Sequence, residues 1–251
     1  MKITVNIDDK LSVDNVSTII AEKLRQENIP FTFEYEPYSK EYIEWEREIL
    51  SKPIVIDDIA IKVLTVRNKH FKLLDDCDTT GKKVIEIEPS NCFGVGTHPT
   101  TQMCIKALKK HLPENAKVLD VGCGSGILSI VSLLYGALSA EGIDIDGSAI
   151  KGAKNNAMLN GVADKFTVRQ GDLIEGVTDE YNVVVANILT DPLKELIPNL
   201  KNCLAENGIA VISGVIDFRK EEVEELLHDD FDIVEQTAEE NWCCYVLKKH
   251  S

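Results

Sequence analysis

Short apolar runs and longer amphipathic stretches take turns along the chain from Thr97 onward. Apolar–polar alternation over about four to eight residues predicts strands, and apolar residues spaced about three and four apart predict helices. The predicted strands lie at 118–121, 140–145, 166–169, 183–187, 209–213, 231–235 and 242–247. The predicted helices lie at 99–111, 127–135, 148–160, 192–205 and 218–227.

The order of these elements predicts the fold class. Strands that alternate with helices over short connections form a mostly parallel sheet with helices on both faces. The last two strands follow each other without a helix between them, which indicates a hairpin at one edge. We therefore predict an α/β fold with a doubly wound, seven-stranded, mostly parallel sheet that is similar to the Rossmann fold.

The part of the chain before residue 91 is less regular. The pattern predicts strand, helix and strand at 3–7, 13–26 and 31–36, a short helix at 42–50, and extended segments at 54–66 and 83–88 around a polar turn at 75–82. We predict a small N-terminal α+β appendage over 1–40, a linking region over 41–90 and the α/β domain over 91–251.

A glycine-rich turn follows the first strand of the α/β domain, in the stretch Lys117-Val-Leu-Asp-Val-Gly-Cys-Gly-Ser-Gly126. Gly122 and Gly124 allow a tight turn and close approach of a ligand at the sheet edge where doubly wound folds bind. A dinucleotide fingerprint would need a third glycine where Ile127 stands. The GxGxG spacing with Asp120 ahead of it favours a ligand without phosphates, such as S-adenosylmethionine. Turn geometry alone is the alternative explanation for these glycines.

Acidic residues mark the end of the second strand. Asp144 lies about 20 residues past the glycine turn, where a carboxylate accepts hydrogen bonds from ribose hydroxyls. Its neighbours Ile143 and Ile145 are expected to point inward. Asp146 is the expected N-cap of the following helix. The sequence thus assigns the ribose to Asp144.

Polar residues also follow the third and fourth strands. Asp172 can receive an adenine amino group with Leu173 against the ring, although a plain turn explains this position equally well. Asn187 emerges at the carboxyl edge, where its amide can orient an amine beside a sulfonium without adding charge. The alternative is that Asn187 caps the next helix, a role that Thr190 or Asp191 could also fill.

A shaped loop with the sequence Phe93-Gly-Val-Gly-Thr-His-Pro-Thr-Thr101 precedes the helix at 99–111. It could fold over the methionine end of a cofactor, and Thr101 is a candidate contact. Thr100 or Thr101 could instead cap the helix. His98 could act as a base, although one histidine in a loop is weak evidence for that role.

The charge and composition of the chain indicate which kinds of partner it can bind. The net charge is −15, and the sequence contains no basic run that would bind a phosphate backbone, so we expect a basic protein substrate and no direct nucleic-acid partner. The chain contains no apolar run long enough to span a membrane and no signal peptide. The seven cysteines lack paired metal-ligand spacing, so we expect free thiols in a reducing cytoplasm and no metal site.

Taken together, these stretches resemble class I methyltransferases, and specifically the ribosomal protein methyltransferase family called PrmA. The resemblance rests on FGVGTHPTT, VLDVGCGSGILSI, GIDIDGSAI, KNNAMLNGV, VVVANILTDPL and the late ENWC, and it covers about residues 42–248. It implies a cofactor, S-adenosylmethionine, held by Thr101, Gly122, Asp144 and Asn187. It also implies methylation of lysine and terminal amines of large-subunit ribosomal protein eleven.

The chain departs from the family at its start. Fuller members have a complete substrate-recognition domain ahead of the segment Trp45-Glu-Arg-Glu48, whereas about 40 residues precede it here. The region 1–40 is therefore interpreted as a shortened recognition segment.

The function predicted from the sequence is protein N-methyl transfer, with cofactor contacts at Thr101, Gly122, Gly124, Asp144, Asp172 and Asn187. Asn187 would position the substrate amine, and no dedicated general base is needed. A methyltransferase of the same fold that acts on another protein, an RNA base or a small molecule is one alternative. Ile127 disfavours a nicotinamide oxidoreductase. The intact glycine turn disfavours a non-catalytic binding protein.

Overall fold

The computed structural model describes residues 52–65, 69, 74, 77–89 and 94–250. The elements predicted at 3–7, 13–26, 31–36 and 42–50 lie outside these residues, as do Trp45-Glu-Arg-Glu48 and Phe93.

A seven-stranded sheet forms the centre of the fold, in the order β6-β5-β4-β7-β8-β10-β9. The strands are β4 (Lys117–Val121), β5 (Ser139–Asp144), β6 (Phe166–Gln170), β7 (Tyr181–Asn187), β8 (Leu204–Ile216), β9 (Phe231–Glu239) and β10 (Trp242–Lys249). Strands β4 to β8 run parallel, and β10 runs antiparallel to both β8 and β9. The doubly wound, mostly parallel sheet with an edge hairpin is confirmed.

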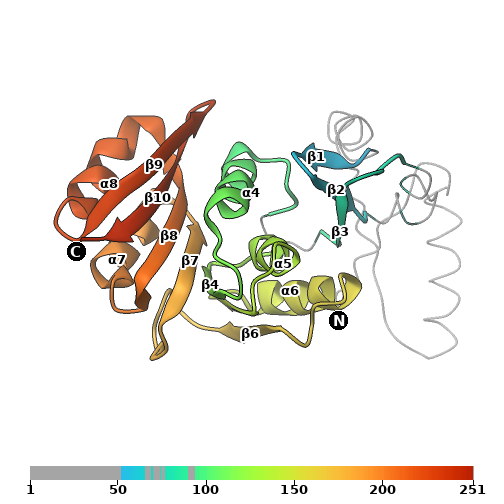
Figure 1. The fold of residues 1–251 in the computed structure, drawn as a ribbon, viewed down its shortest axis with the longest axis horizontal. Helices are drawn as coiled ribbons and strands as arrows, with labels where there is room; N and C mark the ends of the chain where they lie inside the picture. The colour runs from blue at the N-terminus through green and yellow to red at the C-terminus, as the bar shows by residue number, and fades with distance from the viewer. Residues whose placement is uncertain (1–51, 66–68, 70–73, 75–76, 90–93, 251) are drawn as a thin grey trace, which may run out of the picture.

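Helices cover both faces of this sheet. Helices α4 (Pro99–His111), α5 (Ile127–Leu134) and α6 (Gly147–Leu159) lie on one side, and α7 (Thr190–Leu200) and α8 (Lys220–Leu227) lie on the other (Figure 1). Successive residues of each strand point to opposite faces, so Val183 and Val184 enter different cores. Cys243 and Cys244 also divide between the two cores, and every cysteine in the described part is a free thiol.

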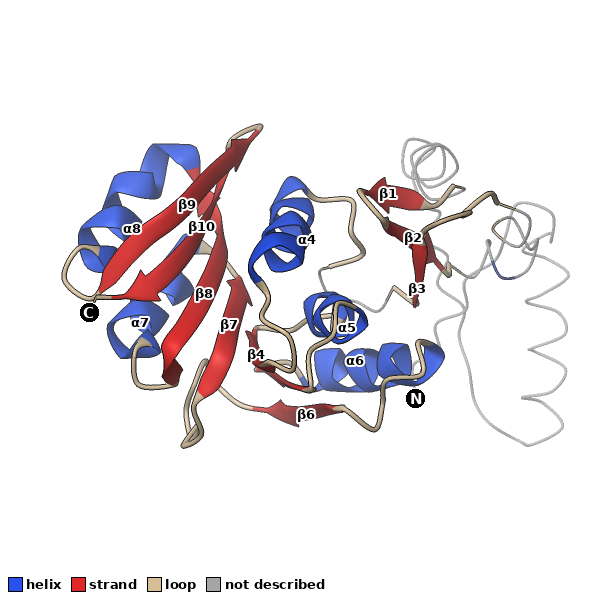
Figure 2. Ribbon diagram, in the orientation of Figure 1, coloured by secondary structure: helices blue, strands red, loops and turns tan. Residues whose placement is uncertain are grey.

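A second sheet of three strands packs outside α5 and α6 (Figure 2). It contains β1 (Ile54–Ile56), β2 (Ile59–Val63) and β3 (Lys83–Ile87); β1 pairs antiparallel with β2, and β2 pairs parallel with β3. Ile61 and Ile85 are fully buried in the same core as Ile130 of α5. The Tyr135 hydroxyl donates to Asp58 Oδ1 at 2.9 Å. The three strands therefore share one hydrophobic core with the α/β domain.

Two expectations about single elements were wrong. The helix predicted at 192–205 ends at Leu200, and Ala205 belongs to β8. Buried Cys203 and Leu204 continue the apolar spacing of the helix, but Leu204 pairs with Tyr181 of β7 and begins β8. Ile145 was expected to point inward, yet it is 67% exposed because β5 ends one residue earlier.

Candidate active site

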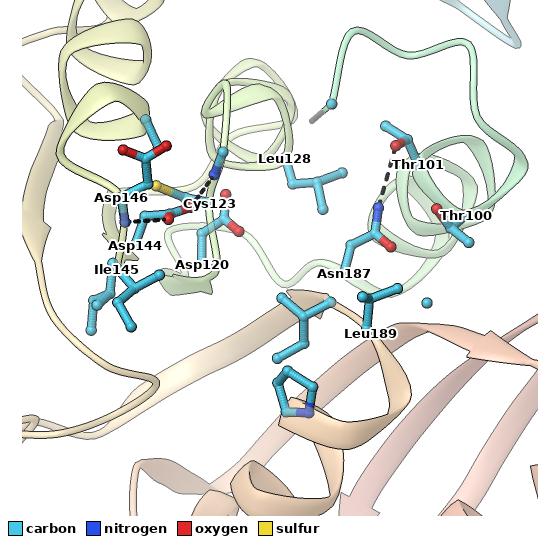
Figure 3. A pocket seen from close by; sticks show the side chains of 18 of the residues that line it. Thr100, Thr101, Asp120, Cys123, Leu128, Asp144, Ile145, Asp146, Asn187 and Leu189 are labelled. Atoms are coloured by element: carbon cyan, nitrogen blue, oxygen red, sulfur yellow. Dashed lines mark hydrogen bonds between the residues drawn. The ribbon is translucent and has the colours of Figure 1, made fainter. Parts of the chain in front are cut away.

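A cavity of about 570 Å³ opens at the carboxyl ends of β4, β5 and β7, beside the first turn of α4. This size lies within the range of about 300–1,000 Å³ that small-molecule sites occupy. The structure brings all six predicted contact residues to its walls: Thr101, Gly122, Gly124, Asp144, Asp172 and Asn187. In Figure 3, Asp144 lies at one end of the site and Asn187 with Thr101 at the other, with Asp120 between them.

The glycine-rich turn from β4 to α5 forms the floor of the site. The amides of Gly122 and Cys123 both donate to the carbonyl of Ile143, at 2.8 and 3.0 Å. Gly122 has a φ of 69°, and a Cβ at this position would lie 2.3 Å from Ile188 Cγ2. Only glycine satisfies both the left-handed backbone and the close neighbour. The turn therefore exposes backbone rather than side chains to the cavity.

Asp144 holds the turn and the start of α6 together. Its Oδ2 accepts from the Gly124 amide at 2.8 Å, and its Oδ1 accepts from the Asp146 amide at 3.0 Å. Each oxygen of an ionised carboxylate has a second lone pair, so Asp144 keeps acceptor capacity toward the cavity. Asp146 accepts from the Ser148 amide at 2.8 Å, which confirms it as the N-cap of α6.

Asp120 is buried beneath the turn, only 1% exposed, and also reaches the cavity wall. Its Oδ2 accepts from the Ser129 amide at 3.1 Å and from the Ser129 hydroxyl at 2.8 Å. Burial raises the pKa of Asp120 to about 7, because the Ser129 hydrogen bonds only partly offset the loss of water and Asp144 adds like charge. The sequence marked Asp120 as part of the motif but not as a group that titrates near neutral pH.

Asn187 lies at the other end of the site. Its Nδ2 donates to the hydroxyl of Thr101 at 3.3 Å, which leaves Oδ1 as the free acceptor end of the amide. Leu189 occupies the N-cap position of α7 without any side-chain hydrogen bond, so neither Asn187 nor Thr190 caps this helix. The capping alternative for Asn187 was wrong.

Gly214 supports the same end and was missed by the sequence reasoning. It has a φ of 90°, and a Cβ there would lie 1.9 Å from the carbonyl oxygen of Ile188. The end of β8 therefore approaches the backbone after Asn187 more closely than any side chain would permit. A glycine directly after the strand predicted at 209–213 was the available signal.

His98, not Thr100 or Thr101, is the N-cap of α4. Its Nδ1 accepts from the Thr100 amide at 3.3 Å, and Pro99 begins the helix. The ring meets Trp242 edge-on, with centroids 5.0 Å apart. Burial lowers the pKa of His98, although Glu240 opposes this effect, so the neutral form of the ring is favoured at neutral pH. Both rings line the cavity. From the sequence, Trp242 was known only as part of the family motif ENWC and was not predicted as a site residue.

The charges around the cavity have one sign. Asp120, Asp144, Asp146 and Asp172 line it, and none of the described residues along its wall is lysine or arginine. Two of the first three amides of α5 are already occupied, because Ile127 N donates to Ser125 Oγ at 3.3 Å and Ser129 N donates to Asp120. A helix N-terminus with its amides engaged does not offer the usual phosphate site. The carboxylates around the cavity can accept hydrogen bonds from hydroxyls and attract a cationic ligand, whereas they would repel a pyrophosphate.

Comparison with known proteins places the chain in a family. The sequence profile of the family described as ribosomal protein L11 methyltransferase (PrmA) matches residues 13–250. This chain belongs to that family. A ribosomal protein L11 methyltransferase from Carboxydothermus hydrogenoformans is 35% identical over 240 residues, which cover 94% of this chain and 76% of that protein. Another from Bacillus pumilus is 41% identical over 167 residues, covering 66% of this chain and 54% of that protein.

A solved structure agrees with these matches. The crystal structure of ribosomal protein L11 methylase from Lactobacillus delbrueckii subsp. bulgaricus superposes with a TM-score of 0.70 at 26% identity, covering 80% of this chain and 100% of that one. The family and the fold class predicted from the sequence are confirmed. The chain spans about half the length of most of the curated relatives it matches.

The residues that the structure describes contain no group of three or more histidine, cysteine, aspartate or glutamate side chains placed to hold a metal ion. None of their helices combines the length and the apolar character needed to cross a membrane.

Proposed function

We propose that this chain transfers methyl groups from S-adenosylmethionine to amino groups of a protein, and that ribosomal protein L11 is the substrate. One observation carries the proposal: a pocket at the carboxyl edge of the sheet has a glycine turn and Asp144 at one end and the Thr101–Asn187 pair at the other. Family membership supports the same activity and the same cofactor.

The acidic wall suits this cofactor in its details. Asp144 would accept hydrogen bonds from the ribose hydroxyls through the lone pairs that are not bonded to the amides of Gly124 and Asp146. Asp172 would accept from the adenine amino group, with Leu173 against the ring. The exposed backbone at Gly122 and Gly124 would lie along the methionine portion, with Thr101 and Asn187 beyond it. Buried negative charge at Asp120 would complement the positive sulfur.

Bound S-adenosylmethionine would supply a methyl group already activated on a sulfonium, so the residues of this chain need only present the amine in line and keep water out. The free Oδ1 of Asn187 would accept from the amine and orient its lone pair. The rings of His98 and Trp242 would form apolar walls around the incoming side chain.

The amine must arrive without its proton. Deprotonating a lysine with a reference pKa near 10.4 costs about 4–5 kcal/mol at neutral pH. Desolvation between apolar walls lowers that cost by disfavouring the ammonium form. The neutral His98 has its Nδ1 engaged with Thr100, so we assign it no role as a general base.

The substrate assignment rests on the relatives, which are named as ribosomal protein L11 methyltransferases. A net charge of −15 would attract a basic protein. Within the chain, we propose that residues 1–40 help to select the substrate and that 91–251 carry the transfer chemistry. The three strands between 52 and 89 would act with the catalytic unit, because they share its core.

The test combines cofactor binding with methyl transfer. Calorimetry of the purified chain should detect binding of S-adenosylhomocysteine, and incubation with labelled S-adenosylmethionine and purified L11 should transfer label to L11. Mass spectrometry would then locate the methylated amines. Binding without transfer to L11 would leave the methyltransferase but reject this substrate, and a labelled-methyl assay on lysate would identify another. Tighter binding of a nicotinamide dinucleotide would reject the proposal as a whole.

A further inference from the structure

The outer edge of the three-stranded sheet is closed by two asparagine side chains. Strand β3 lies at the edge of that sheet, and α6 runs beside it. Asn160 accepts from the Glu86 amide at 3.0 Å and donates to the Glu86 carbonyl at 2.7 Å. Asn156 does the same for Glu88, accepting at 2.9 Å and donating at 3.4 Å. Each asparagine thus pairs with both backbone groups of one residue, as a neighbouring strand would.

The match follows from the repeats of helix and strand. Residues four apart on a helix are about 6 Å apart along its axis. Residues two apart on a strand, whose backbone groups face the same edge, are about 6.6 Å apart. Asn156 and Asn160 on α6 therefore meet Glu86 and Glu88 in register. Backbone groups that would otherwise be unpaired at an edge are satisfied by α6.

The two asparagines differ in the bond made by their remaining N–H. Asn160 donates to the carbonyl of Asn156, within its own helix, at 2.7 Å. Asn156, which is fully buried, donates at 2.9 Å to the carbonyl of Ser125, in the glycine turn. The Ser125 hydroxyl in turn donates to the carbonyl of Gly94, in the loop that leads to His98. A single side chain thus joins the outer sheet to the turn under the cofactor site.

We propose that Asn156 is a positioning residue for the cofactor site: it ties the glycine turn to the outer sheet, so cofactor affinity depends on a residue that does not line the cavity. The inference rests on the proposed function, since it concerns the same cofactor. No described residue of the three outer strands lines the cavity either, so their influence on it passes through contacts such as this one. Asn160 closes the same edge without touching the turn and provides a matched control.

The physical effect of losing Asn156 is local. Its removal leaves the Ser125 carbonyl without its present partner in a buried position, and both backbone groups of Glu88 without theirs in a part-buried one, which favours rearrangement of the turn. The Gly124 amide, which donates to Asp144, belongs to that turn and would move with it. Removal of Asn160 exposes only the Glu86 groups and one helix carbonyl.

The experiment compares Asn156→Ala with Asn160→Ala in the full chain. The probe is S-adenosylhomocysteine, titrated by calorimetry. We expect Asn156→Ala to raise the Kd at least tenfold and Asn160→Ala to change it by less than about twofold, while thermal denaturation shows comparable losses of stability. At saturating cofactor, kcat of Asn156→Ala should lie within about threefold of wild type, which separates positioning from chemistry. Equal changes in Kd for the two variants, or an unchanged Kd for Asn156→Ala, would overturn the inference.

A measurement on the wild-type chain tests the same link without relying on either variant to fold. Coupling is reciprocal, so a cofactor that orders the turn should also tighten the bonds of Asn156. Amide hydrogen exchange should therefore slow at Glu88 on adding S-adenosylhomocysteine, and slow less at Glu86. An unchanged rate at Glu88 while the probe binds would refute the coupling. Failure of the wild type to bind the probe would instead refute the proposed function.

Discussion

We expect cofactor binding to depend on pH through the buried carboxyl of Asp120. Its pKa is raised to about 7 by burial, so it is largely neutral below pH 6 and ionised above pH 8. A cation in the cavity favours the ionised form and lowers this pKa on binding. Affinity for a cationic ligand must therefore be weakest at low pH and rise through neutrality. S-adenosylhomocysteine, which lacks the sulfonium charge, should show a much smaller rise.

The size of the effect follows from simple electrostatics. Opposite charges about 6 Å apart at an effective dielectric of about 20 attract by about 2.8 kcal/mol, which lowers a pKa by about two units. Asp120 would then titrate near 5 in the bound state, starting from about 7 in the free protein. Proton linkage then predicts an affinity for S-adenosylmethionine about ninefold higher at pH 8 than at pH 6.

Calorimetric titration with both ligands between pH 6 and pH 8 measures this effect as the ratio of their dissociation constants. Asp120→Asn is the control, because it removes the titrating group and keeps an oxygen that can accept from Ser129. The ratio should change with pH in the wild type and stay flat in the variant, which corrects for titration of the ligands themselves. A ratio that varies equally in both proteins would show that Asp120 does not sense the sulfonium.

Three further substitutions test the site. Asp144→Ala should weaken S-adenosylhomocysteine binding by about 1–3 kcal/mol, the scale of a lost charged hydrogen bond, and an unchanged Kd in a folded variant would reject the ribose assignment. Asn187→Ala should lower turnover at least tenfold with a smaller loss of cofactor affinity. Normal turnover in a steady-state assay would show that Asn187 does not position the substrate amine. Gly214→Ala should lower the thermal midpoint and raise KM for the protein substrate, because its Cβ would lie 1.9 Å from the Ile188 carbonyl oxygen. A variant with the wild-type midpoint and the wild-type KM would contradict this geometry.

Local sequence signals predict much of the fold. The helix predicted at 99–111 has those bounds in the structure, because Pro99 suits a first turn and Pro113 follows soon after the end. Short apolar runs predicted central strands that are buried on both faces, and the absence of a helix between the last two predicted strands indicated the edge hairpin. The glycine turn and the acid after the second strand placed Gly122 and Asp144 at one edge, because carboxyl ends of parallel strands meet there.

Tertiary structure decided the rest. The end of α7 was set by pairing of Leu204 with Tyr181, which overrode a helical apolar spacing that continued past it. Thr101 and Asn187 are 86 residues apart, and their hydrogen bond depends on how α4 packs against the sheet. The pKa of Asp120 depends on its burial, to which the whole core contributes. Local patterns indicate the type and order of the elements, whereas a side chain's partners and its access to water depend on segments that only the folded chain brings together.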